Sequence, residues 1–348
     1  MLLHTTPLAS QHSIRGVGVY TKFLLDGLNQ SDEVTLLRSN DSPTIKPDVI
    51  HFPWFDFFYA SLPLQLATPL VVTIHDTIPL IYPKYYPPGK KGRLASYWQR
   101  FALSRVSAVI TDSECSKRDI IKFFKFPESK THVVHLAANP AINPDNLVSF
   151  NDLKQTYNLP KTYILYVGDI NYNKNIPQLV KTLKFLPRHI HLICVGKNFV
   201  EQDIPEWKWI QAQVALSNVS DRVHFITDIP SDGAPILSTL YLNALCYIQP
   251  SLYEGFGLPI LEALQVGTIP IAAKLASLPE IGGDSVEWVT EPAAEIMAAK
   301  VLEIADWSIA KRERQIQFGQ RWARKFNWQT TVENTIKIYQ QVTQRKKQ

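Results

Sequence analysis

The chain has 348 residues, of which 45% are hydrophobic and 19% charged, and its formal net charge is +5. The length corresponds to about two average domains, and the composition excludes disordered and collagen-like chains. No apolar run approaches the roughly 18–20 residues of a membrane span, and the first residues lack the basic leader and apolar stretch of a secretory signal. The three cysteines are far apart and without metal-ligand spacing, so we expect buried thiols and a cytoplasmic protein.

Short β-rich apolar runs alternate with helical patterns in the first half, which is typical of parallel α/β sheets. Strands are expected at residues 48–52, 70–74, 108–111 and 132–135. Helices are expected at residues 18–28 and 92–104, where apolar residues recur at three- and four-residue spacing. A Pro- and Asn-rich connector, NPAINPDN, follows after this first series.

A second series of the same kind begins beyond the connector. Strands are expected at residues 163–167, 191–195, 223–226, 244–248 and 269–272, and helices at residues 177–186, 235–242 and 259–266. The tail from Ala293 onward reads as helical and polar. We therefore expect an α/β protein with two doubly wound, Rossmann-like domains at residues 1–150 and 151–325. Ligands of such sheets bind at the carboxyl ends of the strands, which predicts a site in a cleft between the domains.

Residues 81–130 form a basic segment, with eleven Lys or Arg against four acidic residues. Aromatic side chains interleave with these charges: Tyr82, Tyr85, Tyr86, Tyr97, Trp98 and Phe101. Such a segment fits contact with an anionic membrane or a phosphorylated substrate. The alternative is a solvated helix face with long basic side chains. No RNA-binding motif, zinc finger or basic zipper accompanies it, so nucleic acid is not an expected partner.

The most informative stretch is QPSLYEGFGLPILEALQVG at residues 249–267. It follows a predicted strand and opens a helix near Leu258, which places Glu254 on the loop and Glu262 about one turn inside the helix. Gly255 and Gly257 allow close backbone approach, and a helix N-terminus can hold a diphosphate. Carboxylates accept hydrogen bonds from paired sugar hydroxyls, so one could serve a ribose and the other a transferred sugar. The alternative is a helix whose first turn carries Glu because the dipole favours it.

The phrase from Glu254 to Ala263 resembles the signature of the retaining glycosyltransferases of family 4, which have a GT-B fold. Their hallmark is two Glu residues separated by seven others, as at Glu254 and Glu262. The segment I-H-D-x-I-P, which begins at Ile74, resembles sequences of mannosyltransferase-like branches of the family. The likeness extends to Gly16–Thr21, Thr73–Asp76, Thr111–Arg118, Ser277–Glu280, Gly282–Asp284 and Phe326–Trp328.

The resemblance implies roles for individual residues. Glu262 would bind the ribose of the nucleotide, and Glu254 would hold the donor sugar. The other donor-binding positions implied are Gly16, Gly18, Lys174, Gly255, Phe256, Gly257 and Leu258. It also implies that the final helix, at residues 326–348, crosses back to the first domain.

One departure from the family concerns the diphosphate. The family often has an Arg after the first strand of the second domain and a Lys about five residues later. Here Lys174 is present, but Asp169 occupies the Arg position. Either Lys174 and the N-terminus of the helix near Leu258 bind the pyrophosphate, together with another cation such as Arg15, or the activity of the enzyme is reduced.

Gly16 and Gly18 form G-x-G without a third glycine, because Thr21 stands at its place, and a dehydrogenase is disfavoured. They are expected in a loop before a helix, where backbone amides can reach a phosphate.

His75 ends a predicted strand, where a histidine is most often structural. The resemblance instead implies contact with the donor sugar, so His75 and Glu254 are the expected catalytic residues. His51 and Trp54 are candidates for the acceptor side, with an aromatic cluster as the alternative.

The sequence has no D-x-D, H-E-x-x-H or C-x-x-C motif, so neither a metal nor a cofactor is expected. These observations together predict a retaining, metal-independent hexosyltransferase. It would use a nucleotide-diphosphate sugar as donor and a saccharide or lipid-linked acceptor. A GT-B phosphorylase or epimerase is one alternative, and a non-catalytic nucleotide-sugar-binding module is another.

Overall fold

The computed structural model describes residues 1–5, 8, 16–38, 46–64 and 67–345. The chain divides into two compact units: Met1–Ala137 with Phe326–Gln348 form the first unit, and Ala138–Lys325 form the second. The boundary therefore lies between Ala137 and Ala138 rather than at residue 150. Hydrogen bonds hold the connector on the second unit. Gln265 Nε2 donates to the carbonyl oxygen of Ile142 at 2.6 Å, and the Asn143 amide donates to Ser238 Oγ at 3.0 Å.

A parallel sheet forms the centre of the first unit, with strand order β2-β1-β3-β4-β5-β6. The strands are β1 (Leu2–Leu3), β2 (Leu37–Arg38), β3 (Ile50–Phe52), β4 (Leu70–Thr73), β5 (Ala108–Thr111) and β6 (Thr131–Val133). Every residue of β3, β4 and β5 is buried, which explains their nearly continuous apolar sequences.

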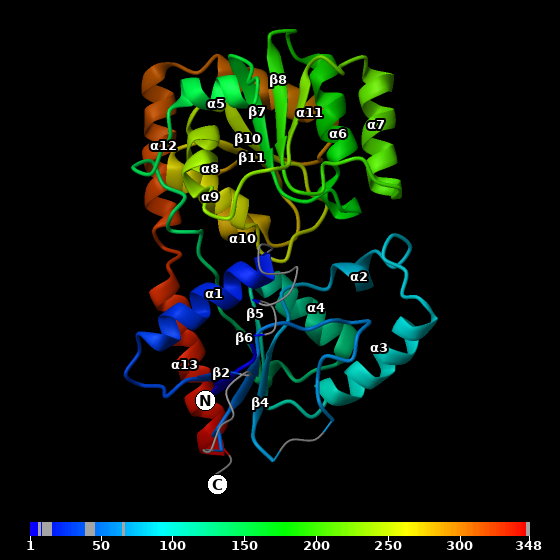
Figure 1. The fold of residues 1–348 in the computed structure, drawn as a ribbon, viewed down its shortest axis with the longest axis vertical. Coiled ribbons are helices and arrows are strands. Elements are labelled where there is room, and N and C mark those ends of the chain that lie inside the picture. Colours follow the sequence, from blue (N-terminus) through cyan, green and yellow to red (C-terminus); the bar gives the residue numbers. More distant parts are fainter. Residues whose placement is uncertain (6–7, 9–15, 39–45, 65–66, 346–348) are drawn as a thin grey trace. The chain divides into compact units, whose positions relative to one another are not determined.

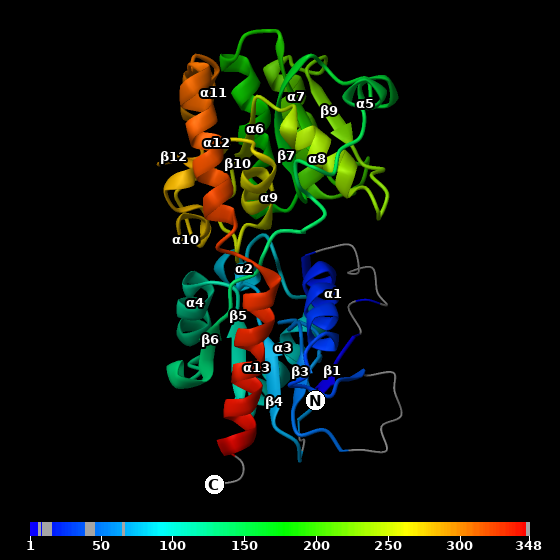
Figure 2. The same cartoon turned by 90° about the vertical axis from the view of Figure 1, so that its left-hand side faces the viewer.

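Helices cover both faces of this sheet (Figure 1). One face carries α1 (Gly16–Asn29) and α13 (Trp328–Arg345), and the other carries α3 (Lys90–Leu103) and α4 (Glu114–Phe124). The short helix α2 (Ile78–Ile81) follows β4, and the turn η3 (Glu128–Lys130) precedes β6. In Figure 2, α13 runs beside the strands of this unit. The stacked rings of Phe23 and Trp328, with centroids 4.9 Å apart, join α1 to α13.

The first turn of α1 corrects the expectation for the glycine segment. The helix already begins at Gly16, so Gly16 and Gly18 lie within its first turn and not in a preceding loop. Gly18 is buried, whereas Gly16 is exposed. Beyond them Tyr20, Leu24 and Leu28 recur every fourth residue, and their burial fixes the inward face of the helix.

The second unit contains another parallel sheet, with order β12-β11-β10-β7-β8-β9. Its strands are β7 (Thr162–Val167), β8 (Ile190–Val195), β9 (Val223–Ile226), β10 (Cys246–Gln249), β11 (Pro270–Ala273) and β12 (Glu287–Val289). Because the order reverses between β7 and β10, a crevice is expected outside the carboxyl ends of these two neighbours.

Two groups of helices sandwich this sheet (Figure 1). One group contains α6 (Ile176–Thr182), α7 (Pro205–Ser217) and α11 (Ala294–Ala305). The other contains α5 (Phe150–Thr156), α8 (Ala234–Leu242), α9 (Leu258–Val266), α10 (Leu278–Gly282) and α12 (Ile309–Ala323). The single turns are η4 (Tyr172–Lys174), η5 (Leu183–Phe185) and η6 (Gly283–Ser285).

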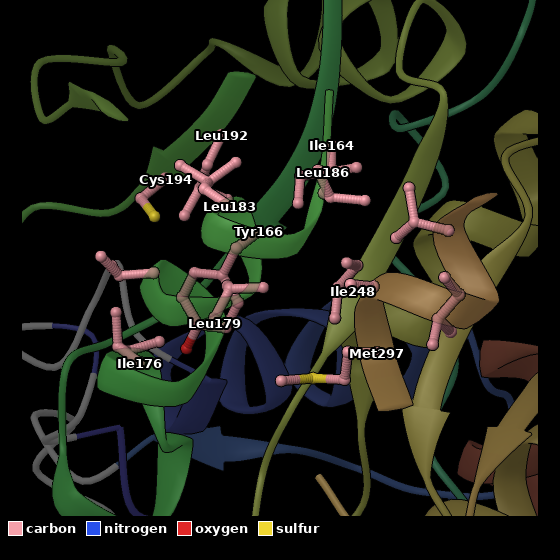
Figure 3. Packing of buried hydrophobic residues seen from close by; sticks show 14 of the residues in the cluster. Ile164, Tyr166, Ile176, Leu179, Leu183, Leu186, Leu192, Cys194, Ile248 and Met297 are labelled. Atoms are coloured by element: carbon pink, nitrogen blue, oxygen red, sulfur yellow. The ribbon is translucent and has the colours of Figure 1, made fainter. Parts of the chain in front are cut away.

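The core of the second unit lies between β7, β8 and β10 and the helices α6 and α11 (Figure 3). Ile164, Leu192 and Ile248 project from the strands toward Leu179 and Met297 on the helices. All five are fully buried. A sheet packed in this way gives the loops at its carboxyl edge a rigid base. Among the described helices, none is long and apolar enough to cross a membrane.

Candidate active site

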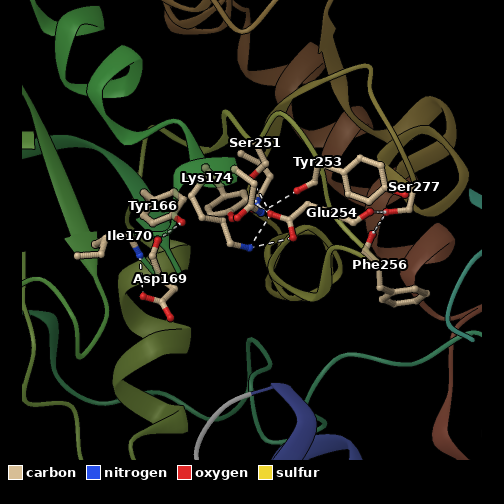
Figure 4. Close-up of polar contacts among 12 residues, drawn as sticks. Tyr166, Asp169, Ile170, Lys174, Ser251, Tyr253, Glu254, Phe256 and Ser277 are labelled. Carbon is tan, nitrogen blue, oxygen red and sulfur yellow. Dashed lines mark hydrogen bonds and ion pairs between the residues drawn. The ribbon is translucent and has the colours of Figure 1, made fainter. Parts of the chain in front are cut away.

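Lys174 and Glu254 meet at the point where the strand order of the second unit reverses. Lys174 ends η4, shortly after β7, and Glu254 lies on the loop after β10. The ammonium Nζ of Lys174 is 2.7 Å from Oε1 and 2.8 Å from Oε2 of Glu254 (Figure 4). The two residues are 80 positions apart in sequence, and the pairing of β7 with β10 brings them together.

The carboxylate of Glu254 is buried and receives hydrogen bonds from two further side chains. Ser251 Oγ donates to Oε1 at 2.6 Å, and Gln249 Nε2 donates to the same oxygen at 2.7 Å. The hydroxyl of Tyr247 in turn hydrogen-bonds to Gln249. This network fixes the position of the Glu254 side chain, because a buried charge requires partners on its oxygens. Sequence reasoning assigned no role to Tyr247, Gln249 or Ser251, although their position directly before Glu254 could have indicated one.

The loop from Glu254 to Leu258 is fastened to the start of α10. Ser277 Oγ lies 2.8 Å from the carbonyl oxygen of Glu254 and 2.9 Å from that of Phe256. Gly257 has φ +114°, and a Cβ there would lie 2.8 Å from Leu278 Cδ2. Only glycine fits this conformation and spacing without strain. The loop therefore approaches α10 closely, with Phe256 buried and the α9 N-terminus beginning at Leu258.

Glu262 lies about one turn inside α9 and is half-buried. Its Oε2 accepts a hydrogen bond from the hydroxyl of Tyr241 in α8 at 3.1 Å. Burial raises the pKa of Glu262 to about 7, against the weaker lowering effect of the Tyr241 hydroxyl. Glu254 and Glu262 thus have different surroundings: the first is ion-paired to Lys174, and the second has a neutral partner.

Asp169 lies in the loop after β7, at the position where the family often has Arg, and its side chain forms hydrogen bonds within this region. Its Oδ1 accepts from the Ile170 amide at 2.8 Å and from Asn198 Nδ2 at 2.6 Å. The hydroxyl of Tyr166 donates to the backbone carbonyl of Asp169 at 2.7 Å. These bonds give Asp169 a role in shaping the loop. Arg15, considered above as a substitute cation, lies outside the described residues.

In the first unit, His75 follows β4 and is held by two acceptors. Its Nδ1 is 2.7 Å from Asp112 Oδ2, and its Nε2 is 3.1 Å from the carbonyl oxygen of Pro53. Asp112 is buried after β5, and within the described part of the chain its Oδ1 has no hydrogen-bond partner. The rings of His75 and Tyr20 are nearly perpendicular, with centroids 4.9 Å apart.

The two acceptor-side candidates have different surroundings. His51 has no exposed surface: its Nδ1 bonds to the hydroxyl of Tyr339 at 2.7 Å and its Nε2 to Thr73 Oγ1 at 2.8 Å. Both ring nitrogens therefore serve the packing of β3 against β4 and α13, which favours a structural role. Trp54 is half-buried just beyond β3.

Within the described part of the chain, no group of three or more His, Cys, Asp or Glu side chains could hold a metal ion.

Family models match both halves of the chain. The model of the glycosyl transferases group 1 matches residues 150–322, and the model of glycosyltransferase family 4 matches residues 20–141. The chain belongs to glycosyltransferase family 4. The loop and helix that carry Glu254 and Glu262 lie within the segment that the group 1 model matches. The expected family, GT-B fold and enzyme class are thereby confirmed: the chain is a glycosyltransferase.

Relatives of this family 4 chain include bacterial mannosyltransferases. O-antigen chain mannosyltransferase B of Escherichia coli is 27% identical over 287 residues, which cover 81% of this chain and 72% of that protein. Serotype-specific mannosyltransferase WbdA of Escherichia coli is 23% identical over 313 residues, which cover 86% of this chain and 37% of that protein. The solved structure of HepE from Anabaena in complex with UDP and glucose is 16% identical, with a TM-score of 0.69, and covers 97% of this chain and 98% of that one. The similarity to HepE shows a shared fold.

Proposed function

We propose that this family 4 enzyme transfers a hexose, mannose in the first instance, from a nucleotide-diphosphate sugar to a hydroxyl of a saccharide or lipid-linked acceptor. The observation that most supports this function is the ion pair of Lys174 and Glu254 at the carboxyl ends of β7 and β10. The setting would be polysaccharide assembly in the cytoplasm. Support for mannose comes from the two bacterial relatives, which are mannosyltransferases by name.

The reaction would proceed with retention at the anomeric carbon. The bond from that carbon to the diphosphate breaks, a bond to the acceptor oxygen forms on the same face, and the acceptor proton leaves with the diphosphate. Negative charge develops on the leaving group, where the cation of Lys174 would stabilise it. Glu254 would face the sugar, and Glu262 would accept hydrogen bonds from the ribose hydroxyls. His75 would contact the donor sugar.

The donor is tested first by binding. A nucleotide sugar that binds only the folded chain raises its melting temperature, so UDP-, GDP- and ADP-sugars are compared by thermal shift. The best donor is then incubated with acceptor saccharides, and the anomeric configuration of the product is read by NMR. Retention supports the proposal, and inversion refutes it. Turnover that requires inorganic phosphate, or sugar conversion without an acceptor, would instead identify a phosphorylase or an epimerase. Unchanged turnover after chelation supports metal independence.

A further inference from the structure

Helix α3 of the first unit exposes its most apolar side. Leu94, Tyr97, Trp98 and Phe101 have 75%, 75%, 44% and 51% of their surfaces exposed. Their spacing of three and four residues places them on one face of the helix. On a helix that packs against a sheet, such a stripe is normally buried, so its exposure requires a separate explanation.

The opposite face of α3 is fixed to the unit and prevents the helix from turning its apolar stripe inward. Gln99 is buried, and its Nε2 donates to the carbonyl oxygen of Asp56 at 2.7 Å and to Ser61 Oγ at 2.6 Å. Its Oε1 accepts from the Leu62 amide at 3.2 Å. Ala102 and Leu103 belong to the buried core of the same unit. Rotation of α3 would break these three hydrogen bonds and expose core residues.

Basic side chains lie at both ends of the exposed apolar stripe. Lys90–Leu103 contains four basic and no acidic residues. Lys90 and Lys91 are exposed and precede Leu94 by four and three residues, so they lie beside the stripe. At the other end, the guanidinium of Arg105 lies over the Phe101 ring, 4.7 Å from its centroid. Arg100, by contrast, is engaged with α4, where it donates to the carbonyl oxygen of Phe123 at 2.9 Å.

We propose that this surface, called the α3 stripe and formed by Leu94, Tyr97, Trp98 and Phe101 with Lys90, Lys91 and Arg105, docks on the surface of an anionic bilayer. Aromatic rings insert at the level of the head groups, whereas lysine and arginine remain in water and attract anionic lipid. A bilayer with anionic head groups offers both chemistries along one plane, which matches a straight stripe with cations at its two ends. The proposal goes beyond glycosyl transfer and requires no donor or acceptor.

The test uses the full chain and vesicles of phosphatidylcholine, with or without phosphatidylglycerol, in a sedimentation assay. Binding is expected only with phosphatidylglycerol and is expected to fall as salt rises. Lys90→Gln with Lys91→Gln should lower the partition coefficient about 30-fold, since each cation near such a surface contributes about 1 kcal/mol. Leu94→Ser with Trp98→Ser should lower it by at least about tenfold, because these side chains supply apolar contact.

The second unit offers matched controls. Leu216 and Trp209 on α7 are 76% and 40% exposed, close to Leu94 and Trp98, so Leu216→Ser with Trp209→Ser removes the same chemistry elsewhere. Lys154→Gln with Lys161→Gln removes two exposed charges from that unit. Both controls should bind vesicles as the unmodified chain does. Circular dichroism and turnover with a water-soluble acceptor should remain unchanged in all variants, which separates this proposal from the proposed function.

Three results would overturn the docking surface. The first is absence of binding to anionic vesicles, and the second is equal binding by the α3 variants and their controls. The third is a self-associated chain that the α3 variants convert to monomers, with no vesicle binding, because the stripe would then be a protein interface. Binding that ignores phosphatidylglycerol would refute the anionic specificity.

Discussion

The imidazole of His75 and the buried carboxyl of Asp112 form a hydrogen-bonded pair, with Nδ1 2.7 Å from Oδ2. The other ring nitrogen faces a backbone carbonyl, that of Pro53, which can only accept a hydrogen bond. Burial alone would lower the pKa of His75, but the charge and hydrogen bond of Asp112, the Pro53 carbonyl and the nearby Asp76 together raise it. Both ring nitrogens therefore face acceptors, and the raised pKa extends to higher pH the range in which the ring carries both protons.

Replacement of Asp112 by Asn tests this relationship through the protonation of His75. Because the pKa of His75 is raised in the folded chain, its stabilising effect is complete below the unfolded value of about 6.5 and is lost as pH rises through the folded value. Asp112→Asn should lower the pKa of His75 and reduce this loss of stability. NMR titration measures the pKa, with the His75 signal assigned by its absence from His75→Gln. An unchanged pKa in Asp112→Asn would refute the pairing.

Glu254→Gln should reduce turnover by about two orders of magnitude, close to the loss of one electrostatic stabiliser in a preorganised site. The amide retains the size of the side chain but loses the charge that faces Lys174. Free nucleotide should bind almost as before, because it lacks the sugar that Glu254 is proposed to hold. Calorimetry with the nucleotide and turnover with the best donor measure the two effects. Lost nucleotide affinity with full turnover would mean that the roles of Glu254 and Glu262 are reversed.

Much of this architecture is predictable from the sequence because its central strands are buried on both faces. Continuous apolar runs such as that of β7 identify such strands directly. The sequence does not predict the short strands β1, β2 and β12, since two or three residues give no periodicity. The sequence predicts a boundary at residue 150 because a Pro-rich connector is typical of a linker. The hydrogen bonds of Gln265 and Asn143 that assign the connector to the second unit are long-range.

The sequence likewise predicts only part of the candidate site. The motif identified Glu254 and Glu262, but the direct pairing of Lys174 with Glu254 depends on the adjacency of β7 and β10, which no local pattern encodes. The burial of His51 likewise depends on Tyr339, 288 positions away. Local sequence indicates that a histidine follows or occupies a strand, whereas tertiary packing decides whether its ring reaches a ligand.

A structural prediction concerns Arg222, a buried arginine outside the proposed site. Its guanidinium donates to four carbonyl oxygens around η5 and the start of β8, at distances of 2.7–3.3 Å: those of Leu183, Leu186, Pro187 and Ile190. Arg222→Met should lower the free energy of unfolding by about 3 kcal/mol, because those carbonyls lose charged donors in the interior. Urea denaturation measures the change. Arg188→Met, at an exposed position of the same turn, should change stability by less than about 0.5 kcal/mol. Equal effects of the two substitutions would contradict the assigned role.

The last prediction concerns pH and nucleotide binding at Glu262. Burial raises the pKa of this carboxyl to about 7, so the folded chain binds a proton that the unfolded chain releases near pH 4.5. The contribution of this group to folding stability should therefore fall as pH rises between these values.

Nucleotide affinity should change in the opposite direction. An ionised carboxylate accepts both ribose hydroxyls, so binding should strengthen as pH rises through about 7 and then level off. Glu262→Gln should weaken binding by about 1.5–3 kcal/mol above this pH and remove the pH dependence. Calorimetric titration with the free nucleotide across this range measures both effects, and the same pH dependence in the unmodified chain and in Glu262→Gln would refute the assignment of the ribose to Glu262.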